Sequence, residues 1–172
     1  GKFWGTFSRK ENRLAKKFIQ ERFKNFKSFK KGFFKNKKII DVGCGGGRYS
    51  NALKLLGAKS VIGVDYSDDG LKIAKKNYQH KNLFFLKQNV LNLKFKSRSF
   101  DIVFSNGVLH HTSNLEKGIE ELHRICKKGG YIYLYLYGAG GLYWSARKKM
   151  NKLMKKIPQN YSQNILNFIG MP

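Results

Sequence analysis

The stretch Ile39-Ile40-Asp41-Val42-Gly43-Cys44-Gly45-Gly46-Gly47-Arg48 decides the fold of this 172-residue chain. A short apolar run leads into a glycine-rich turn, with one carboxylate near the junction. Glycine permits positive φ angles and lets the backbone approach a ligand closely, so glycines at alternate positions predict a cofactor-binding loop between a buried strand and a helix. The alternative is a plain strand-to-helix turn, which would need one glycine rather than four.

Two nucleoside-binding patterns compete for this loop. The dinucleotide fingerprint Gly-x-Gly-x-x-Gly fails in both registers, because its third glycine would fall on Arg48 or on Ser50. The pattern that fits is Asp41-x-Gly43-x-Gly45-x-Gly47. An acidic residue just before the loop suits a ligand with an ammonium group rather than a pyrophosphate, and S-adenosylmethionine is such a ligand.

Apolar strands alternate with amphipathic helices along the chain, which predicts a parallel sheet covered on both faces. The expected class is therefore α/β, a doubly wound Rossmann-like domain whose ligand lies at the carboxyl ends of the strands. The expected strands span 38–42, 60–64, 83–87, 100–105 and 130–137, and the expected helices span 47–57, 68–79 and 115–127.

A basic amphipathic helix is expected before the first strand. Ser8-x-x-Glu11 has the form of a capping box, and Gly32 would end the helix. Such a helix can lie on a membrane, but it more commonly packs on its own domain. The apolar residues at helical spacing are Leu14, Phe18, Ile19, Phe23, Phe26 and Phe29.

Polar residues follow three of the expected strands. Asp65 ends the second strand, where its carboxylate can accept from both ribose hydroxyls, and Tyr66 beside it can cover a base. A helix-capping role for Asp65 is the alternative, but Ser67 and its acidic neighbours already supply caps. Asn89 and Val90 follow the third strand, where the Asn amide could bond the adenine edge. The fourth strand ends in residues 105–111, beside the place expected for the transferred group.

Together these blocks resemble the class I S-adenosylmethionine-dependent methyltransferases, in particular the broad small-molecule group called type 11. The resemblance covers residues 37–137 and rests also on Phe100-Asp101-Ile102-Val103, on Val108-Leu109-His110-His111, and on residues 121–130. It implies transfer of a methyl group from S-adenosyl-L-methionine to a small-molecule acceptor by in-line displacement. One alternative is a methyltransferase that acts on RNA or on a membrane-associated quinone or lipid. A non-catalytic module that binds the same cofactor is the alternative from another class.

The resemblance also implies roles for single residues. Asp41 would face the methionyl ammonium, Asp65 would hold the ribose, Asn89 would meet the adenine amine, and the Asn106 backbone would lie near the sulfonium. Position 89 is usually Asp in such enzymes, and the Asn amide oxygen is a weaker acceptor. The expected cofactor site comprises Asp41, Gly43, Cys44, Gly45, Gly47, Asp65, Tyr66, Asn89, Val90 and Asn106.

His110 and His111 are the histidines nearest to this expected site. An oxygen acceptor needs a general base, and one of these two residues is the candidate. The alternative is that both shape the pocket through packing and hydrogen bonds. No zinc-ligand grouping surrounds either cysteine, so no metal is expected.

The net charge of +25 lies mainly in residues 1–38 and 138–172. RNA and an anionic membrane surface are therefore possible partners, although Lys far outnumbers Arg, the better residue for bidentate recognition. The two unpaired cysteines, and the lack of a signal peptide or a bilayer-length apolar run, favour a reducing cytoplasm.

Three segments are expected. Residues 1–36 would form the N-terminal helix, 37–137 the cofactor-binding core, and 138–172 a basic helical segment that starts the acceptor side. The chain is expected to be a fragment that lacks the last two strands of the family domain. The last expected strand would then have an unpaired, aggregation-prone edge.

Overall fold

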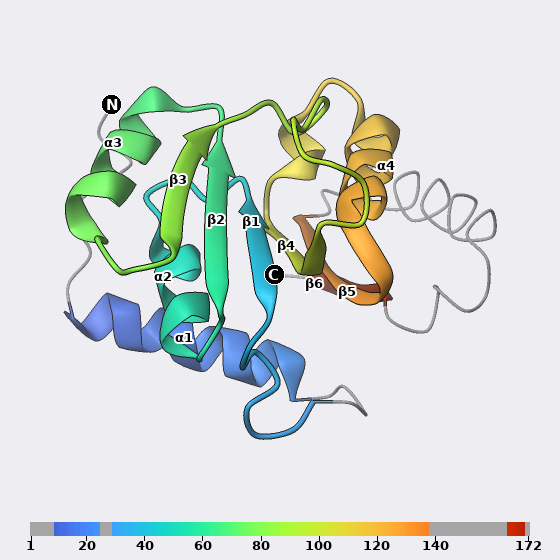
Figure 1. Ribbon diagram of the computed structural model, residues 1–172. Helices are drawn as coiled ribbons and strands as arrows, with labels where there is room; N and C mark the ends of the chain where they lie inside the picture. The colour runs from blue at the N-terminus through green and yellow to red at the C-terminus, as the bar shows by residue number, and fades with distance from the viewer. Residues whose placement is uncertain (1–8, 25–28, 138–164, 171–172) are drawn as a thin grey trace. The chain divides into compact units, whose positions relative to one another are not determined.

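The computed structural model describes residues 9–24, 29–137 and 165–170, the last of these by their backbone alone (Figure 1). The chain divides into two compact units, Gly1–Gln88 and Asn89–Pro172, which are described separately below. Of the basic helical segment expected over 138–172, residues 138–164 and 171–172 lie outside the described residues. In the part of the chain that the structure describes, no helix has both the length and the apolar character needed to cross a membrane.

The first unit is a parallel sheet with helices packed on one face. Its strands are ordered β3-β2-β1, and each pairs in parallel with its neighbour. Figure 1 shows α1 and α2 behind these strands. The elements are α1 (Arg9–Phe23), β1 (Lys38–Val42), α2 (Arg48–Leu55), β2 (Ser60–Asp65), α3 (Asp68–Asn77) and β3 (Leu83–Lys87).

A glycine within β2 lets α2 lie close to the sheet. A Cβ built on Gly63 would come within 2.7 Å of Ser50 Oγ, a residue of α2, and within 2.8 Å of the ring of Phe85. Gly63 is the register partner of both Asp41 in β1 and Phe85 in β3. Residues 41, 63 and 85 therefore face the helices, and their neighbours along each strand face the other way.

The N-terminal helix α1 packs on α2, and its extent and its buried face differ from those expected. Its buried residues are Ala15, Ile19 and Phe23, whereas Leu14 is 53% exposed. The helix ends at Phe23 rather than near Gly32. Of the remaining positions, Ser8 and Phe26 lie outside the described residues.

Aromatic packing accounts for the early end of α1. The chain folds back through turns over residues 31–36, and the ring of Phe34 lies 5.1 Å from that of Phe23. Phe29 joins the same cluster, 5.5 Å from Phe33. The phenylalanines that follow α1 therefore pack in a ring cluster and do not extend the helix. Rings that pack on one another bury as much apolar surface as rings along one helix face would.

The second unit is also parallel, with strand order β4-β5-β6. Its elements are β4 (Phe100–Asn106), the 3₁₀-helix η1 (Leu109–His111), α4 (Leu115–Ile125), β5 (Cys126–Tyr137) and β6 (Ile165–Gly170). Asn114 caps α4, accepting from the backbone N–H of Lys117 at 2.9 Å. The ring of Tyr133 stacks on that of Phe104 at 4.6 Å in the interior.

The last of the expected strands has a partner, which corrects the prediction of an unpaired edge. β6 pairs with β5 in parallel, with Ile132 opposite Ile165 and Tyr137 opposite Gly170. The short apolar run near the end of the chain is therefore a strand. Apart from this addition, all five expected strands and three expected helices are present, and the α/β class with a parallel sheet is confirmed.

Candidate cofactor-binding site

The glycine loop joins β1 to α2 in a conformation that requires glycine. Gly43, Gly45 and Gly47 have φ angles of 79°, 50° and 80°, which side-chain-bearing residues rarely adopt. The backbone N–H groups of Gly43 and Cys44 both donate to the carbonyl of Val64, at 2.7 and 3.0 Å. The loop is therefore fixed to the end of β2.

Lack of space restricts two glycines at this loop, one of which, Gly47, also has a positive φ angle. A Cβ on Gly47 would lie 2.8 Å from the ring of Phe85 and 2.9 Å from Cβ of Ala74. Gly70, in the first turn of α3, would place a Cβ 3.1 Å from the backbone of Gly45. The close packing of α2 and α3 around the loop thus depends on small residues, of which Gly70 was not predicted.

Asp65 connects the loop to the second strand. Its Oδ2 accepts from the N–H of Gly45 at 2.7 Å, and its Oδ1 accepts from the N–H of Ser67 at 2.8 Å. Each carboxylate oxygen has a further lone pair, so both can still accept from a ligand hydroxyl. The helix cap is supplied by Ser67, whose Oγ accepts from Gly70 N–H at 3.2 Å. Asp65 is therefore held in position but keeps its capacity to bind.

Tyr66 is 72% exposed beside this carboxylate. The ammonium group of Lys87 lies 5.6 Å from the centre of its ring, and Lys87 also pairs with Asp68 at 2.5 Å. The ring can thus cover an aromatic base without first leaving a packed position.

Asp41 lies beneath the loop, with 1% of its surface exposed. Its Oδ2 accepts from Ser50 Oγ at 2.6 Å. Burial raises the pKa of this carboxyl to about 7, the Ser50 hydroxyl opposes that rise, and the charge of Asp65 adds to it. A direct contact between Asp41 and a ligand ammonium stays a prediction. Ser50 was not predicted, although a glycine inside a strand, such as Gly63, signals close approach of another element.

Cys44 is buried in the loop, and its pKa is raised mainly by burial and further by the carboxylates of Asp41 and Asp65. The thiol therefore stays neutral at physiological pH. Thiolates rather than thiols are the reactive form, so the residue contributes packing to the loop and not nucleophilic chemistry.

In the second unit, the two predicted Asn residues are both engaged within the protein. Asn89 Oδ1 accepts from the N–H of Leu91 at 2.9 Å, which forms a local turn and leaves its NH₂ group as the donor side. Asn106, at the end of β4, accepts from Tyr133 Oη at 3.3 Å. Val90 is partly buried next to Asn89. The residue after Asn106 again has a left-handed backbone conformation that favours glycine, since Gly107 has a φ of 73°.

His110 and His111 lie together in η1, with ring centres 3.9 Å apart. Burial lowers the pKa of His110, and the neighbouring His111 lowers it further. His110 is therefore neutral at pH 7, the form that can accept a proton. His111 is exposed.

A comparison with protein families agrees with this geometry. The family model described as a methyltransferase domain matches residues 40–134, which is more than half of the chain. This chain belongs to the class I S-adenosylmethionine-dependent methyltransferases. S-adenosylmethionine is the cofactor that this membership implies, and the Asp65 carboxylate with its available acceptors fits its ribose.

The curated relatives of this chain carry different names. It is 30% identical over 109 residues to a ubiquinone biosynthesis O-methyltransferase of Pelagibacter ubique, covering 58% of this chain and 42% of that protein. It is 30% identical over 129 residues to a demethylmenaquinone methyltransferase of Chlorobaculum tepidum, covering 75% and 49%. A probable tRNA methyltransferase 9B of Mus musculus is 29% identical over 128 residues, covering 71% and 26%. The chain thus spans less than half the length of these three proteins.

Solved structures show the same fold. An S-adenosylmethionine-dependent methyltransferase from Mesorhizobium loti superposes with a TM-score of 0.58 at 21% identity, covering 69% of this chain and 51% of that one. At this identity the likeness concerns the fold alone, and it agrees with the Rossmann-like class expected from the sequence.

Proposed function

We propose that this methyltransferase chain binds S-adenosylmethionine through the glycine loop and Asp65 and transfers its methyl group to a small-molecule acceptor. The observation that carries the proposal is the pair of hydrogen bonds from Gly45 and Ser67 to Asp65. They fix the carboxylate against the loop while a lone pair on each oxygen stays available. A carboxylate that served only to cap α3 would not need to bind the loop.

The residues of the first unit then have separate roles. Asp65 accepts from the ribose hydroxyls, and Tyr66 covers the base. Gly43 and Gly45 line the methionyl part, where the buried carboxylate of Asp41 favours a positive charge. When bound, S-adenosylmethionine supplies an activated methyl group on a sulfonium. The protein contributes alignment and the exclusion of water.

The family resemblance further implies that Asn89 and Val90 meet the adenine and that the Asn106 backbone lies near the sulfonium. For an oxygen acceptor, His110 or His111 takes the proton. His110 is suited to this role because its lowered pKa keeps the ring neutral. Replacing each His by Ala and measuring methyl transfer over a pH series tests the role; retained activity with an unchanged profile would exclude it.

Isothermal titration calorimetry tests the cofactor assignment. We expect Asp65→Asn to weaken S-adenosylmethionine binding at least about tenfold, because the amide keeps one acceptor where the carboxylate has two. Asp69→Asn, which changes an exposed acid in the first turn of α3, is the matched control and should bind like the wild type. Equal affinities for Asp65→Asn and the wild type would contradict the assignment, provided both variants unfold at similar temperatures.

A transfer assay with S-adenosylmethionine labelled in its methyl group then identifies the acceptor class. Quinones and their precursors come first, because one relative is named for ubiquinone biosynthesis and another for demethylmenaquinone. RNA is the second class, supported by the basic flanks and by the mouse relative's name. Binding of S-adenosylmethionine without transfer to either class would favour the non-catalytic module instead.

A further inference from the structure

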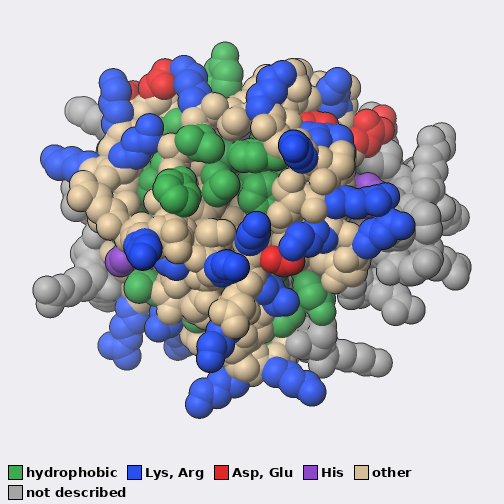
Figure 2. Space-filling view, in the orientation of Figure 1, with side chains coloured by type: hydrophobic (Ala, Val, Ile, Leu, Met, Phe, Trp, Pro, Cys, Tyr) green, Lys and Arg blue, Asp and Glu red, His purple; other side chains and the backbone are tan. Residues whose placement is uncertain are grey.

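One face of the first unit exposes large apolar side chains. Gly63 and Phe85 face α2 and α3, so the alternating residues Ile62, Phe84 and Leu86 face the opposite side of the sheet. Phe84 is 53% exposed and Leu86 is 40% exposed, and Ile62 is partly exposed. We call Ile62, Phe84 and Leu86 the β3 face. Figure 2 shows hydrophobic side chains gathered over β3 and β2.

Such a cluster is unusual for a surface in contact with water. Scattered single hydrophobic residues are normal on soluble proteins, whereas adjacent large ones mark a contact site. Phe84 and Leu86 stand two residues apart on the same face, and Phe84 lies opposite Ile62 in the register. Within the first unit β3 is also the last strand of the sheet, so the cluster lies at its border.

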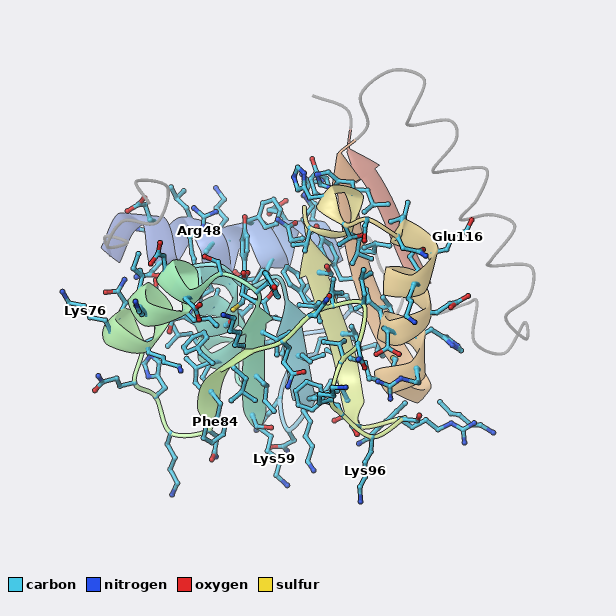
Figure 3. The ribbon with its side chains drawn as sticks, turned by 90° about the horizontal axis from the view of Figure 1, so that it is seen from above. Arg48, Lys59, Lys76, Phe84, Lys96 and Glu116 are labelled. Atoms are coloured by element: carbon cyan, nitrogen blue, oxygen red, sulfur yellow. The ribbon has the colours of Figure 1, made fainter. Side chains whose placement is uncertain are left out.

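Positive charge lies beside the β3 face. From Gly70 to Phe100 the sequence contains Lys and Arg but no Asp or Glu. Lys81, which precedes β3, is exposed, whereas Lys87 at the end of β3 alternates with Leu86, lies on the helix side of the sheet and pairs with Asp68. Figure 3 shows Lys59 projecting on the same side of the sheet as Phe84, away from α1. Apolar side chains with a border of lysines match a surface that is negatively charged outside and apolar within.

We propose that the β3 face docks on an anionic lipid bilayer, with Phe84 and Leu86 entering the headgroup–acyl boundary and the lysines contacting lipid phosphates. This pairing of apolar insertion and basic attraction is how interfacial proteins hold to membranes. A second copy of this chain would bring two strongly basic surfaces together and is disfavoured by charge. RNA would be bound by stacking aromatic rings and by Arg, whereas Leu86 and Ile62 cannot stack. The proposal does not depend on the acceptor or on catalysis.

Vesicle flotation of the full chain tests the proposal. We expect binding to vesicles of phosphatidylcholine with about 30% phosphatidylglycerol, an anionic content close to the physiological one, and little binding to phosphatidylcholine alone. Binding should be lost in about 0.5 M salt, well above physiological ionic strength, because salt screens the attraction between lysines and lipid phosphates. Phe84→Thr/Leu86→Thr should reduce binding about tenfold, because the apolar surface that enters the bilayer is removed. Threonine keeps the strand propensity of β3.

Leu14→Gln/Leu55→Gln is the matched control. Leu14 and Leu55 are 53% and 50% exposed, on the helices α1 and α2. This variant should bind vesicles like the wild type. Equal loss in both double variants, or no loss in Phe84→Thr/Leu86→Thr, would overturn the proposal. Circular dichroism and thermal unfolding verify that each variant is folded.

A second measurement reports depth directly. Phe84→Trp places a fluorophore in the β3 face, and lipids brominated in their acyl chains should quench it above the background of the wild type, which carries Trp4 and Trp144. Absence of added quenching would overturn the insertion of β3. Tight binding of an RNA oligomer with no binding to anionic vesicles would likewise reject the membrane in favour of nucleic acid.

Discussion

Replacing Asp41 by Asn should make the stability of this methyltransferase chain less dependent on pH. Burial raises the pKa of Asp41 from 3.8 to about 7 in the folded protein. A carboxyl with a higher pKa when folded binds its proton more tightly in that state. Its favourable contribution is therefore complete below pH 3.8 and is lost as the pH rises through about 7.

The size of the effect follows from this shift. One pKa unit corresponds to about 1.4 kcal/mol, so a shift of roughly three units amounts to about 4 kcal/mol over the whole window. Between pH 5 and pH 8 the same pKa values give a loss of about 2.5 kcal/mol. An Asn at position 41 has nearly the same shape, can still accept from the Ser50 hydroxyl, and has no charge to bury.

Urea unfolding of the wild type and Asp41→Asn at pH 5, 6, 7 and 8 measures the difference. The free energy of unfolding of the variant, minus that of the wild type, should increase by about 2 to 3 kcal/mol from pH 5 to pH 8. Asp69→Asn, which removes an exposed carboxylate, should show no such trend. A constant difference between Asp41→Asn and the wild type across this range would refute the reasoning.

Three further outcomes follow from the same contacts. Gly63→Ala should lower the free energy of unfolding by about 1 to 3 kcal/mol, because its Cβ would meet Ser50 and Phe85; an unchanged urea midpoint would show that α2 can move away freely. Asn114→Ala should cost about 1 kcal/mol by removing the cap of α4, whereas Asn114→Ser should restore most of it. If Asp41 favours the ligand's ammonium group, calorimetry at pH 7 in two buffers of different ionisation enthalpy should show proton release on S-adenosylmethionine binding, and Asp41→Asn should show none.

Local chemistry made most of the fold predictable. The glycine loop could be placed because positive φ angles demand glycine, and Gly43, Gly45 and Gly47 have them. The strands before and after it were predictable because both faces of a parallel sheet are apolar. Helix starts such as Asn114 carry capping side chains that the sequence shows directly.

Features that depend on distant partners were missed. The end of α1 at Phe23 could not be read from apolar spacing, because Phe29 satisfies the same spacing while packing in a ring cluster with Phe33 and Phe34. The exposure of Leu14 likewise depends on which side of α1 meets α2. β6 is a short apolar run whose pairing with β5 spans many residues of chain, so no local pattern identifies its partner.

Gly63, Ser50 and Asp41 show that a sequence can indicate a close contact without identifying the residue that makes it. A glycine within a buried strand indicates that another element approaches closely, but the identity of the contacting residue depends on how the helix crosses the sheet. Here the neighbour is Ser50, whose hydroxyl donates to the carboxylate of Asp41. Burial and the charge of Asp65 both disfavour the ionised form of Asp41 and so raise its pKa. Placing two acids around one loop costs stability at neutral pH, and an apolar residue at position 41 would avoid that cost. A positively charged ligand beside the loop would relieve the repulsion between them, so the arrangement itself favours a cationic ligand such as S-adenosylmethionine.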